Sequence, residues 1–116
     1  MNKRSVGSDK EDLVTRFLEH NGVKILDRNY STDRGEIDIV GADGDYVVFF
    51  EVKYRKTAEH GNPLEAITPG KIRRIVGASK VYLYQNHYSD NTYVRYDCIG
   101  VLGDKITWIK NVFDAF

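Results

Sequence analysis

The segment from Tyr46 to Arg55 constrains the fold more than any other part of the chain. It opens with a run of apolar residues and continues without a break into Glu51-Val52-Lys53. Successive residues of an extended strand point to opposite faces of a sheet, so an unbroken apolar run places apolar side chains on both faces. We therefore expect this strand to lie inside a sheet.

Turn residues and hydrophobic spacing predict two helices around this strand. Ser8 followed by Glu11 matches a capping box, and the apolar helical stripe after it ends at Asn21-Gly22. A second helix is expected to begin at Thr68-Pro69. The other expected elements are strands at 23–30, 35–40, 46–55, 92–102 and 105–110, and a loop at 57–67 with a short helical turn at 64–66. The predicted order is αβββαββ, an α/β sandwich around a central mixed β-sheet.

Length and composition favour one globular domain. The chain has 116 residues, of which 41% are apolar and 29% charged, and this composition excludes disordered and fibrous proteins. We expect a single domain over residues 1–116, with its core at about residues 8–110. The 17 Lys and Arg balance the 17 Asp and Glu, which argues against a general polyanion binder but allows a local basic patch.

Cysteine content and hydropathy indicate the compartment. The single cysteine, Cys98, leaves no partner for an internal disulfide and fits a reducing environment. The longest apolar run is far shorter than the ~20 residues of a spanning helix, and the N-terminus lacks the hydrophobic segment of a signal peptide. We expect a cytoplasmic protein without a membrane or a disulfide partner.

The short turn at Gly41–Asp45 is expected to make the strands at 35–40 and 46–55 antiparallel neighbours. A turn centred on Asp43-Gly44 pairs positions whose numbers sum to roughly 87 to 89 in such a hairpin. Asp38 then lies opposite the residues near 49 to 51. Strand alternation also predicts that Ile37 and Ile39 share one face and that Asp38 lies on the other.

Two carboxylates, Asp38 and Glu51, are thus expected to meet at one point of the sheet. Like charges at short range raise one pKa unless a cation intervenes, and a divalent ion with oxygen ligands is the natural partner. The alternative for Glu51 is an ion pair with Lys53 at the strand end, and the alternative for Asp38 is a surface position near a turn. Glu11 borders the core-facing stripe of its helix, so it either caps the helix or belongs to the same site.

These residues resemble a known motif. Asp38 followed by Glu51-Val52-Lys53 resembles the D…ExK motif of the PD-(D/E)xK nuclease superfamily. A wider pattern over about residues 4 to 102 resembles the bacterial YraN-like family, whose members are identified as predicted endonucleases similar to archaeal Holliday-junction resolvases. The residues that carry this resemblance are Gly7, Glu11, Arg28-Asn29-Tyr30, Gly35–Val40, Val48–Arg55 and Arg95-Tyr96-Asp97. The chain departs from the pattern at Ile37, where the superfamily has Pro, and at Lys10, where relatives have Gly.

The resemblance implies a restriction-endonuclease-like fold and a deoxyribonuclease that depends on Mg²⁺ or Mn²⁺. Asp38 and Glu51 would bind the ion, with the Val52 carbonyl as a backbone ligand and Glu11 reaching the ion or its water shell. Lys53 would orient or help to deprotonate the attacking water and would counter charge on the phosphate.

The segment from Lys53 to Lys80 carries the candidate DNA surface. It contains seven Lys or Arg residues against two Glu residues, a net excess of five positive charges in a neutral chain. The residues expected to contact nucleic acid are Arg55, Lys56, Lys71, Arg73 and Arg74. The alternative for each of them is an ordinary solvated position.

Two classes of function remain open after this reading. The leading one is an endonuclease that hydrolyses DNA phosphodiester bonds at branched or Holliday-junction DNA, as a homodimer with two sites. The alternative is a catalytically silent nucleic-acid-binding or scaffold module on the same fold, and an RNA-directed enzyme is a third hypothesis. Core packing or a dimer surface explains the C-terminal tyrosines better than base stacking does. They are Tyr82, Tyr84, Tyr88, Tyr93 and Tyr96.

Overall fold

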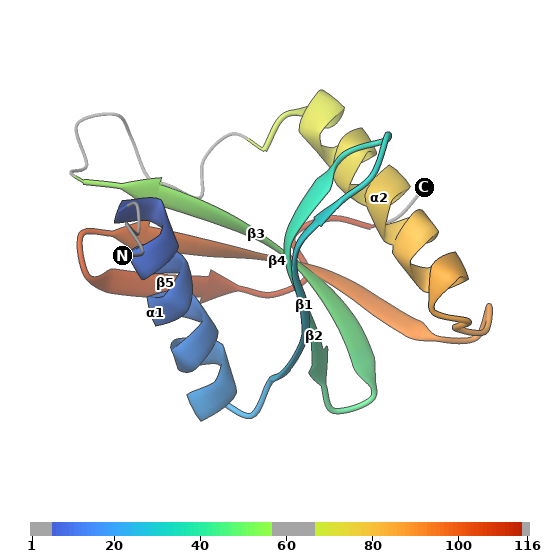
Figure 1. Cartoon of the computed structure of the whole chain (residues 1–116), viewed down its shortest axis with the longest axis horizontal. Helices are drawn as coiled ribbons and strands as arrows, with labels where there is room; N and C mark the ends of the chain where they lie inside the picture. Colours follow the sequence, from blue (N-terminus) through green and yellow to red (C-terminus); the bar gives the residue numbers. More distant parts are fainter. Residues whose placement is uncertain (1–5, 57–66, 115–116) are drawn as a thin grey trace, which may run out of the picture.

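The computed structural model describes residues 6–56 and 67–114, in which two helices lie against a five-stranded mixed sheet (Figure 1). The elements are α1 (Val6–His20), β1 (Lys24–Ser31), β2 (Glu36–Asp43), β3 (Tyr46–Arg55), α2 (Pro69–Gln85), β4 (Tyr93–Leu102) and β5 (Lys105–Ile109). Their order is the αβββαββ order that the sequence predicts. The predicted helical turn at 64–66 lies outside the described residues. Within these residues, neither helix combines the length and the apolar character that crossing a membrane requires.

The strands lie in the sheet in their chain order, and β3 is the central one. β3 and β4 are parallel, from the pair Tyr46 and Tyr93 to the pair Arg55 and Leu102. The other neighbouring strands are antiparallel. A parallel pair requires a long crossover, and α2 belongs to the segment that makes it. The central position confirms the interpretation of the apolar run as an inner strand.

Alternate residues of β3 divide the core into two layers, and the two helices lie on opposite sides of the sheet (Figure 1). Val48 and Phe50 pack in the layer that contains Val14 and Leu18 of α1. The layer beneath α2 contains Val47, Phe49, Ile75, Val76 and Tyr82. Burial of each such side chain contributes about 1.5–3 kcal/mol. Both helices are therefore held by burial of one apolar face.

The first helix begins earlier than the sequence predicts. Ser8 lies inside α1, which starts at Val6, so the predicted capping box of Ser8 with Glu11 is wrong. β2 runs further than predicted, to Asp43, so the predicted turn at Gly41–Asp45 is wrong in its extent and covers only Gly44 and Asp45. The ends of the other strands lie within one residue of the predicted ones. Gly22 ends α1 with a φ of 89°, and the Thr68 side chain accepts a hydrogen bond from a backbone amide in the first turn of α2.

The middle of β2 departs from regular alternation at Asp38. Ile37 packs in the layer beneath α2 and Ile39 packs in the layer beneath α1, so the prediction that they share a face is wrong. The register of β1 and β2 places Asn29 opposite Asp38, and Asn29 has a φ of 53°. A positive φ at a residue other than glycine is uncommon and interrupts the regular alternation of an extended strand. The two strands thus change faces together at this point.

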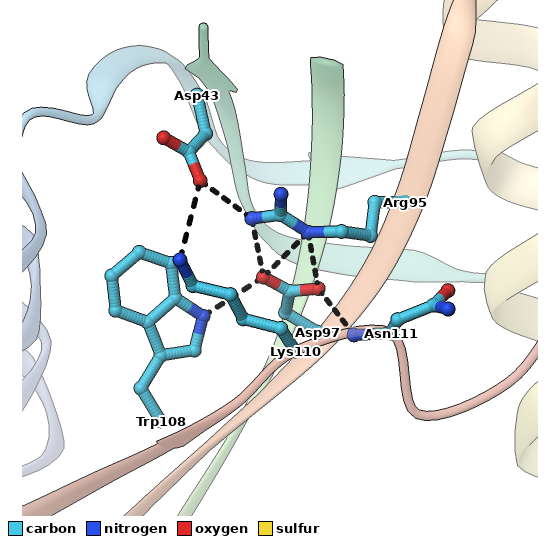
Figure 2. A network of polar contacts seen from close by, with 6 residues as sticks. All are labelled: Asp43, Arg95, Asp97, Trp108, Lys110 and Asn111. Atoms are coloured by element: carbon cyan, nitrogen blue, oxygen red, sulfur yellow. Dashed lines mark hydrogen bonds and ion pairs between the residues drawn. The ribbon is translucent and has the colours of Figure 1, made fainter.

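A buried charge network ties the end of the described chain to the sheet (Figure 2). The Asp97 carboxylate, whose side chain is fully buried, accepts hydrogen bonds from Arg95, from the Trp108 indole at 2.8 Å and from the Asn111 amide at 2.9 Å. Arg95 also donates to Asp43 at 2.7 Å. A buried charge is costly unless it is paired and hydrogen-bonded, and both oxygens of Asp97 have partners. Asp97 therefore has a structural role, holding β5 and the β2–β3 turn to β4.

Asp97→Asn should lower the free energy of unfolding by about 3 kcal/mol, because it removes the fully buried charge partner of Arg95 and leaves this guanidinium only the more exposed Asp43. Urea unfolding measures the change. The control is Asp104→Asn, since the Asp104 side chain is 97% exposed and its ion pair with Lys10 lies at the surface. The control should change stability by less than about 0.5 kcal/mol. Equal losses of stability in the two variants would show that the network does not hold the fold.

Candidate functional site

The carboxyl groups of Asp38 and Glu51 come together where β2 and β3 separate. The ladder between these strands ends at the pair Ile39 and Phe50, and this register places Asp38 opposite Glu51. The Asp38 carboxylate Oδ2 accepts a hydrogen bond of 2.7 Å from the Val52 amide, where a regular ladder would supply a backbone carbonyl. The predicted proximity of Asp38 and Glu51 is therefore present. The sum of paired residue numbers is at the upper limit of the predicted range.

Burial and charge repulsion act together on Asp38. Its pKa is raised from the ordinary value of 3.8 to about 7, first by burial and then by hydrogen-bond contact with Glu51 and by the charge of Glu51. The Val52 amide and the Lys71 ammonium lower this pKa without offsetting the rise. The pair therefore carries more negative charge than its surroundings stabilise, which is the condition that a bound cation relieves.

The cation that contacts Glu51 is Lys71, from the first turn of α2. Its Nζ lies 3.3 Å from Glu51 Oε2. This oxygen is buried and has no hydrogen-bond partner in the described part of the chain, so the contact is an ion pair without hydrogen-bond geometry. The sequence placed Lys71 only in the basic run. The signal that could have found it is the Thr68-Pro69 helix start, which fixes Lys71 near the beginning of α2.

Lys53 lies two residues after Glu51 on the same face of β3. It forms no ion pair with another described residue, so the alternative of a Glu51–Lys53 pair is not what the structure contains. The charges of Glu51 and Lys53 both act on the Cys98 thiol, which stands beside Glu51 on β4. Burial is the main cause that raises the pKa of Cys98 to about 11, so this thiol is a packing group. The Lys53 ammonium is left available next to the carboxylates.

Glu11 is held by β1 instead of joining the pair. Its Oε1 accepts hydrogen bonds from Arg28 Nη2 and from Asn29 Nδ2, each at 2.8 Å. Burial and the charges of Glu11 and Asp38 raise the pKa of Tyr54 to about 12, so Tyr54 lies near both carboxylates. The described residues contain no group of three acidic, His or Cys side chains placed to hold a metal ion. The role of Glu11 as a ligand therefore stays a prediction.

The groups at this point fit a hard divalent cation. Asp38 and Glu51 supply carboxylate oxygens, and Glu51 Oε2 is a buried oxygen that no group in residues 6–56 or 67–114 hydrogen-bonds. In an extended strand, the amide and the carbonyl of one residue point to the same side. The Val52 carbonyl therefore faces the edge where its amide meets Asp38. Mg²⁺ is commonly held by one or two carboxylates, with waters and substrate phosphate completing its shell.

The residues expected to contact nucleic acid flank this site on two elements. Arg55 and Lys56 are exposed at the end of β3, and Arg73 and Arg74 are exposed on α2. Lys71 and Arg74 line a cavity of about 330 Å³ between α2 and the β1–β2 turn. The remaining lining residues are Ser31, Thr32, Gly35, Glu36 and Ile75. Lys71 thus lies both at this cavity and next to Glu51, and the role of all five cations in binding nucleic acid stays a prediction.

Gly35 allows the turn between β1 and β2 to approach α2 closely. A Cβ at this position would lie 2.7 Å from the Arg74 carbonyl oxygen, which is closer than such atoms approach. The turn between β1 and β2 can therefore pack directly on the helix that carries Lys71 and Arg74. Among the tyrosines, Tyr82 and Tyr96 are buried in the core, whereas Tyr84 is exposed at the surface.

Metal-free protein should lose stability as the pH rises towards 7, because Asp38 holds a proton in the folded state that the unfolded chain has released. Its contribution is complete below about pH 4 and is lost as the pH passes about 7. Asp38→Asn keeps an acceptor for the Val52 amide and removes the charge. Its stability relative to the parent should increase by about 2 kcal/mol between pH 5 and pH 8.

Urea unfolding in the presence of a chelator at both pH values measures this difference. The matched control is Asp33→Asn, because Asp33 is exposed on the turn that precedes β2. This control should keep the pH dependence of the parent. A parent-like decline in the Asp38→Asn variant would show that Asp38 is not the group that titrates.

Comparisons with known proteins cover nearly the whole chain. A model described as "Uncharacterised protein family UPF0102" matches residues 10–101, which include every candidate site residue. A UPF0102 protein of Lachnoclostridium phytofermentans is 46% identical over 116 residues, which are 100% of this chain and 98% of the relative. UPF0102 proteins of Fusobacterium nucleatum and Chromohalobacter salexigens are 40% and 39% identical, each over 97% of this chain and over 93% and 94% of their own lengths. These matches confirm the family resemblance of the sequence.

Proposed function

The chain belongs to the uncharacterised protein family UPF0102, and we propose that it is a divalent-metal-dependent endonuclease that hydrolyses DNA phosphodiester bonds. The observation that carries this proposal is the close approach of Asp38 and Glu51 at the central strand, where the buried Glu51 Oε2 accepts no hydrogen bond from a described residue. The restriction-endonuclease-like arrangement of the αβββαββ elements is part of the same proposal. A structural ion pair alone would not need two mutually repelling carboxylates.

The residues of the chain divide the chemistry among them. Asp38 and Glu51 would hold the ion, and the Val52 amide keeps the Asp38 carboxylate between the two strands. A bound Mg²⁺ or Mn²⁺ would activate water and neutralise charge on the phosphate. Lys53 has no ion pair among the described residues, so its ammonium can orient the attacking water and counter phosphate charge. Partial burial strengthens each of these electrostatic contacts.

The substrate is proposed from charge and from the resemblance to resolvases. Arg55 and Lys56 are exposed at the end of β3, the strand that carries Glu51, and Arg73 and Arg74 are exposed on α2, the helix that carries Lys71. Phosphate contacts of this kind supply affinity without sequence preference. Branched DNA, a homodimer with two sites and a cytoplasmic location complete the proposal. The ion pair of Lys71 with Glu51 favours the silent-module alternative, because it neutralises the site from within.

Purified protein should cleave DNA only when Mg²⁺ or Mn²⁺ is present, with labelled four-way junction preferred over flap, single-stranded and linear duplex substrates. Asp38→Asn should abolish cleavage and keep DNA binding, because the ion serves the transition state more than the ground state. Asp33→Asn, with the same change at an exposed turn, should behave as the parent. Binding without cleavage under all these conditions would favour the silent module, and neither binding nor cleavage of DNA would contradict both proposals. Labelled RNA in the same assay tests the third hypothesis.

Replacing both Arg73 and Arg74 by Glu should weaken DNA binding and reduce its salt dependence. For each phosphate that the protein no longer neutralises, the slope of log affinity against log salt becomes shallower by about 0.9. Fluorescence anisotropy at several salt concentrations measures this slope. An unchanged slope would place the DNA surface elsewhere on the molecule.

A further inference from the structure

Lys71 joins α2 to the carboxylate pair. Its backbone amide donates to the Thr68 side chain at 3.2 Å, so the helix start fixes the point from which its side chain extends. The side chain reaches the central strand, where Nζ lies 3.3 Å from Glu51 Oε2. It also lowers the pKa of Asp38, so its charge acts on both carboxyl groups. Lys71 is therefore the counterion of the pair in this structure.

The contact with Lys71 balances the charge of Glu51 but does not supply a hydrogen bond to its Oε2. Glu51 Oε2 is buried and accepts no hydrogen bond from a described residue. The Lys71 side chain is 40% exposed, whereas that of Glu51 is 8% exposed. The ammonium can thus exchange Glu51 for water by rotating its flexible stem, while the carboxylate stays buried. Because the Lys71 side chain is flexible and partly exposed, another cation can readily displace it from Glu51.

The cavity beside Lys71 offers the ammonium a second position. Lys71 and Arg74 both line it, and among the described lining residues only Glu36 is acidic. Two cations at one rim attract a phosphate group, which accepts hydrogen bonds from both kinds of side chain. A divalent ion at Glu51 would repel the Lys71 ammonium at the present 3.3 Å, since two positive charges would then share one oxygen. Repulsion by an ion at Glu51 and attraction by a phosphate group at the cavity would both move the Lys71 ammonium from Glu51 towards the cavity.

We propose that Lys71 is an internal counterion that a divalent cation displaces from Glu51, and that the released ammonium then binds a phosphate group of the nucleic acid at this cavity. This inference rests on the proposed function, because it needs an ion at Asp38 and Glu51. It adds that binding of the ion and binding of the nucleic acid support each other, since the first frees a cation for the second. The coupling is reciprocal, as any such linkage must be.

Lys71→Met keeps the apolar stem and removes the charge. It should bind Mn²⁺ about threefold to tenfold more tightly than the parent, because no internal cation competes for Glu51. Isothermal titration calorimetry with the full chain and Mn²⁺ alone measures this affinity. Lys71→Gln should behave in the same way and gives a second variant if one fails to fold. Lys24→Met, the same change at an exposed residue of β1, should bind Mn²⁺ as the parent does.

DNA binding supplies a readout that a purely structural Lys71 would not change. With Ca²⁺ as the ion and a four-way junction as the ligand, the ion should increase the salt slope of the parent by about 0.9, the value of one phosphate contact. The same ion should leave the slope of Lys71→Met unchanged. Anisotropy titrations at several salt concentrations, with and without Ca²⁺, measure both slopes.

The outcomes separate this inference from the proposed function. Parent protein that binds Mn²⁺ while Lys71→Met binds it no more tightly would overturn the counterion role and leave the endonuclease proposal standing. Equal increases of the salt slope in parent and variant would overturn the phosphate contact of Lys71. Parent protein without any Mn²⁺ affinity would overturn both proposals together.

Discussion

The hydrogen bond from the Val52 amide to the Asp38 carboxylate determines the geometry of the site. Where this bond forms, a side chain replaces the backbone acceptor of a regular ladder, and β2 and β3 separate after the pair Ile39 and Phe50. The carboxylate is consequently held between two strands, opposite Glu51, instead of pointing away from the sheet. Asn29 makes the same departure possible from the other side, because its positive φ lets β1 follow the change of faces in β2.

Burial of the carboxylate pair is a net cost to the fold, and the stability is supplied elsewhere. The pKa of Asp38, raised to about 7, records that burial next to Glu51 disfavours its charged form. The two apolar layers on either side of β3 and the Asp97 network carry no such conflict, since their buried groups are packed or paired. Rigid, well-satisfied surroundings are what allow a repelling pair to persist, as is general for functional sites.

Local patterns predicted most of the elements and the meeting of the two carboxylates, because each depends on signals close in the chain. The apolar run of β3, the turn before it and the Thr68-Pro69 helix start are such signals. The wrong or missing predictions concern side chains whose positions depend on residues far away in the chain. Glu11 accepts a hydrogen bond from Arg28, 17 positions away, so the short-range pattern of a capping box gave a wrong prediction for Glu11. Likewise, Ile37 and Ile39 lie on different faces at the point where β1 pairs Asn29, with its positive φ, opposite Asp38, and Lys71 reaches Glu51 only through the packing of α2 on the sheet.

Lys53 and Lys71 both lie beside the carboxylate pair, but they differ in their contacts. This difference determines which group a bound ion must displace. Lys53 is unpaired among the described residues, so it has no contact to give up. Lys71 must leave Glu51, and Asp38 must release its proton at any pH below about 7. An ion at this site therefore competes with a proton on one carboxyl group and with an ammonium on the other. The affinity of the ion therefore depends on releasing the proton from Asp38 and the ammonium from Glu51. Release of the ammonium would bring the charge of Lys71 to the cavity that Arg74 also lines.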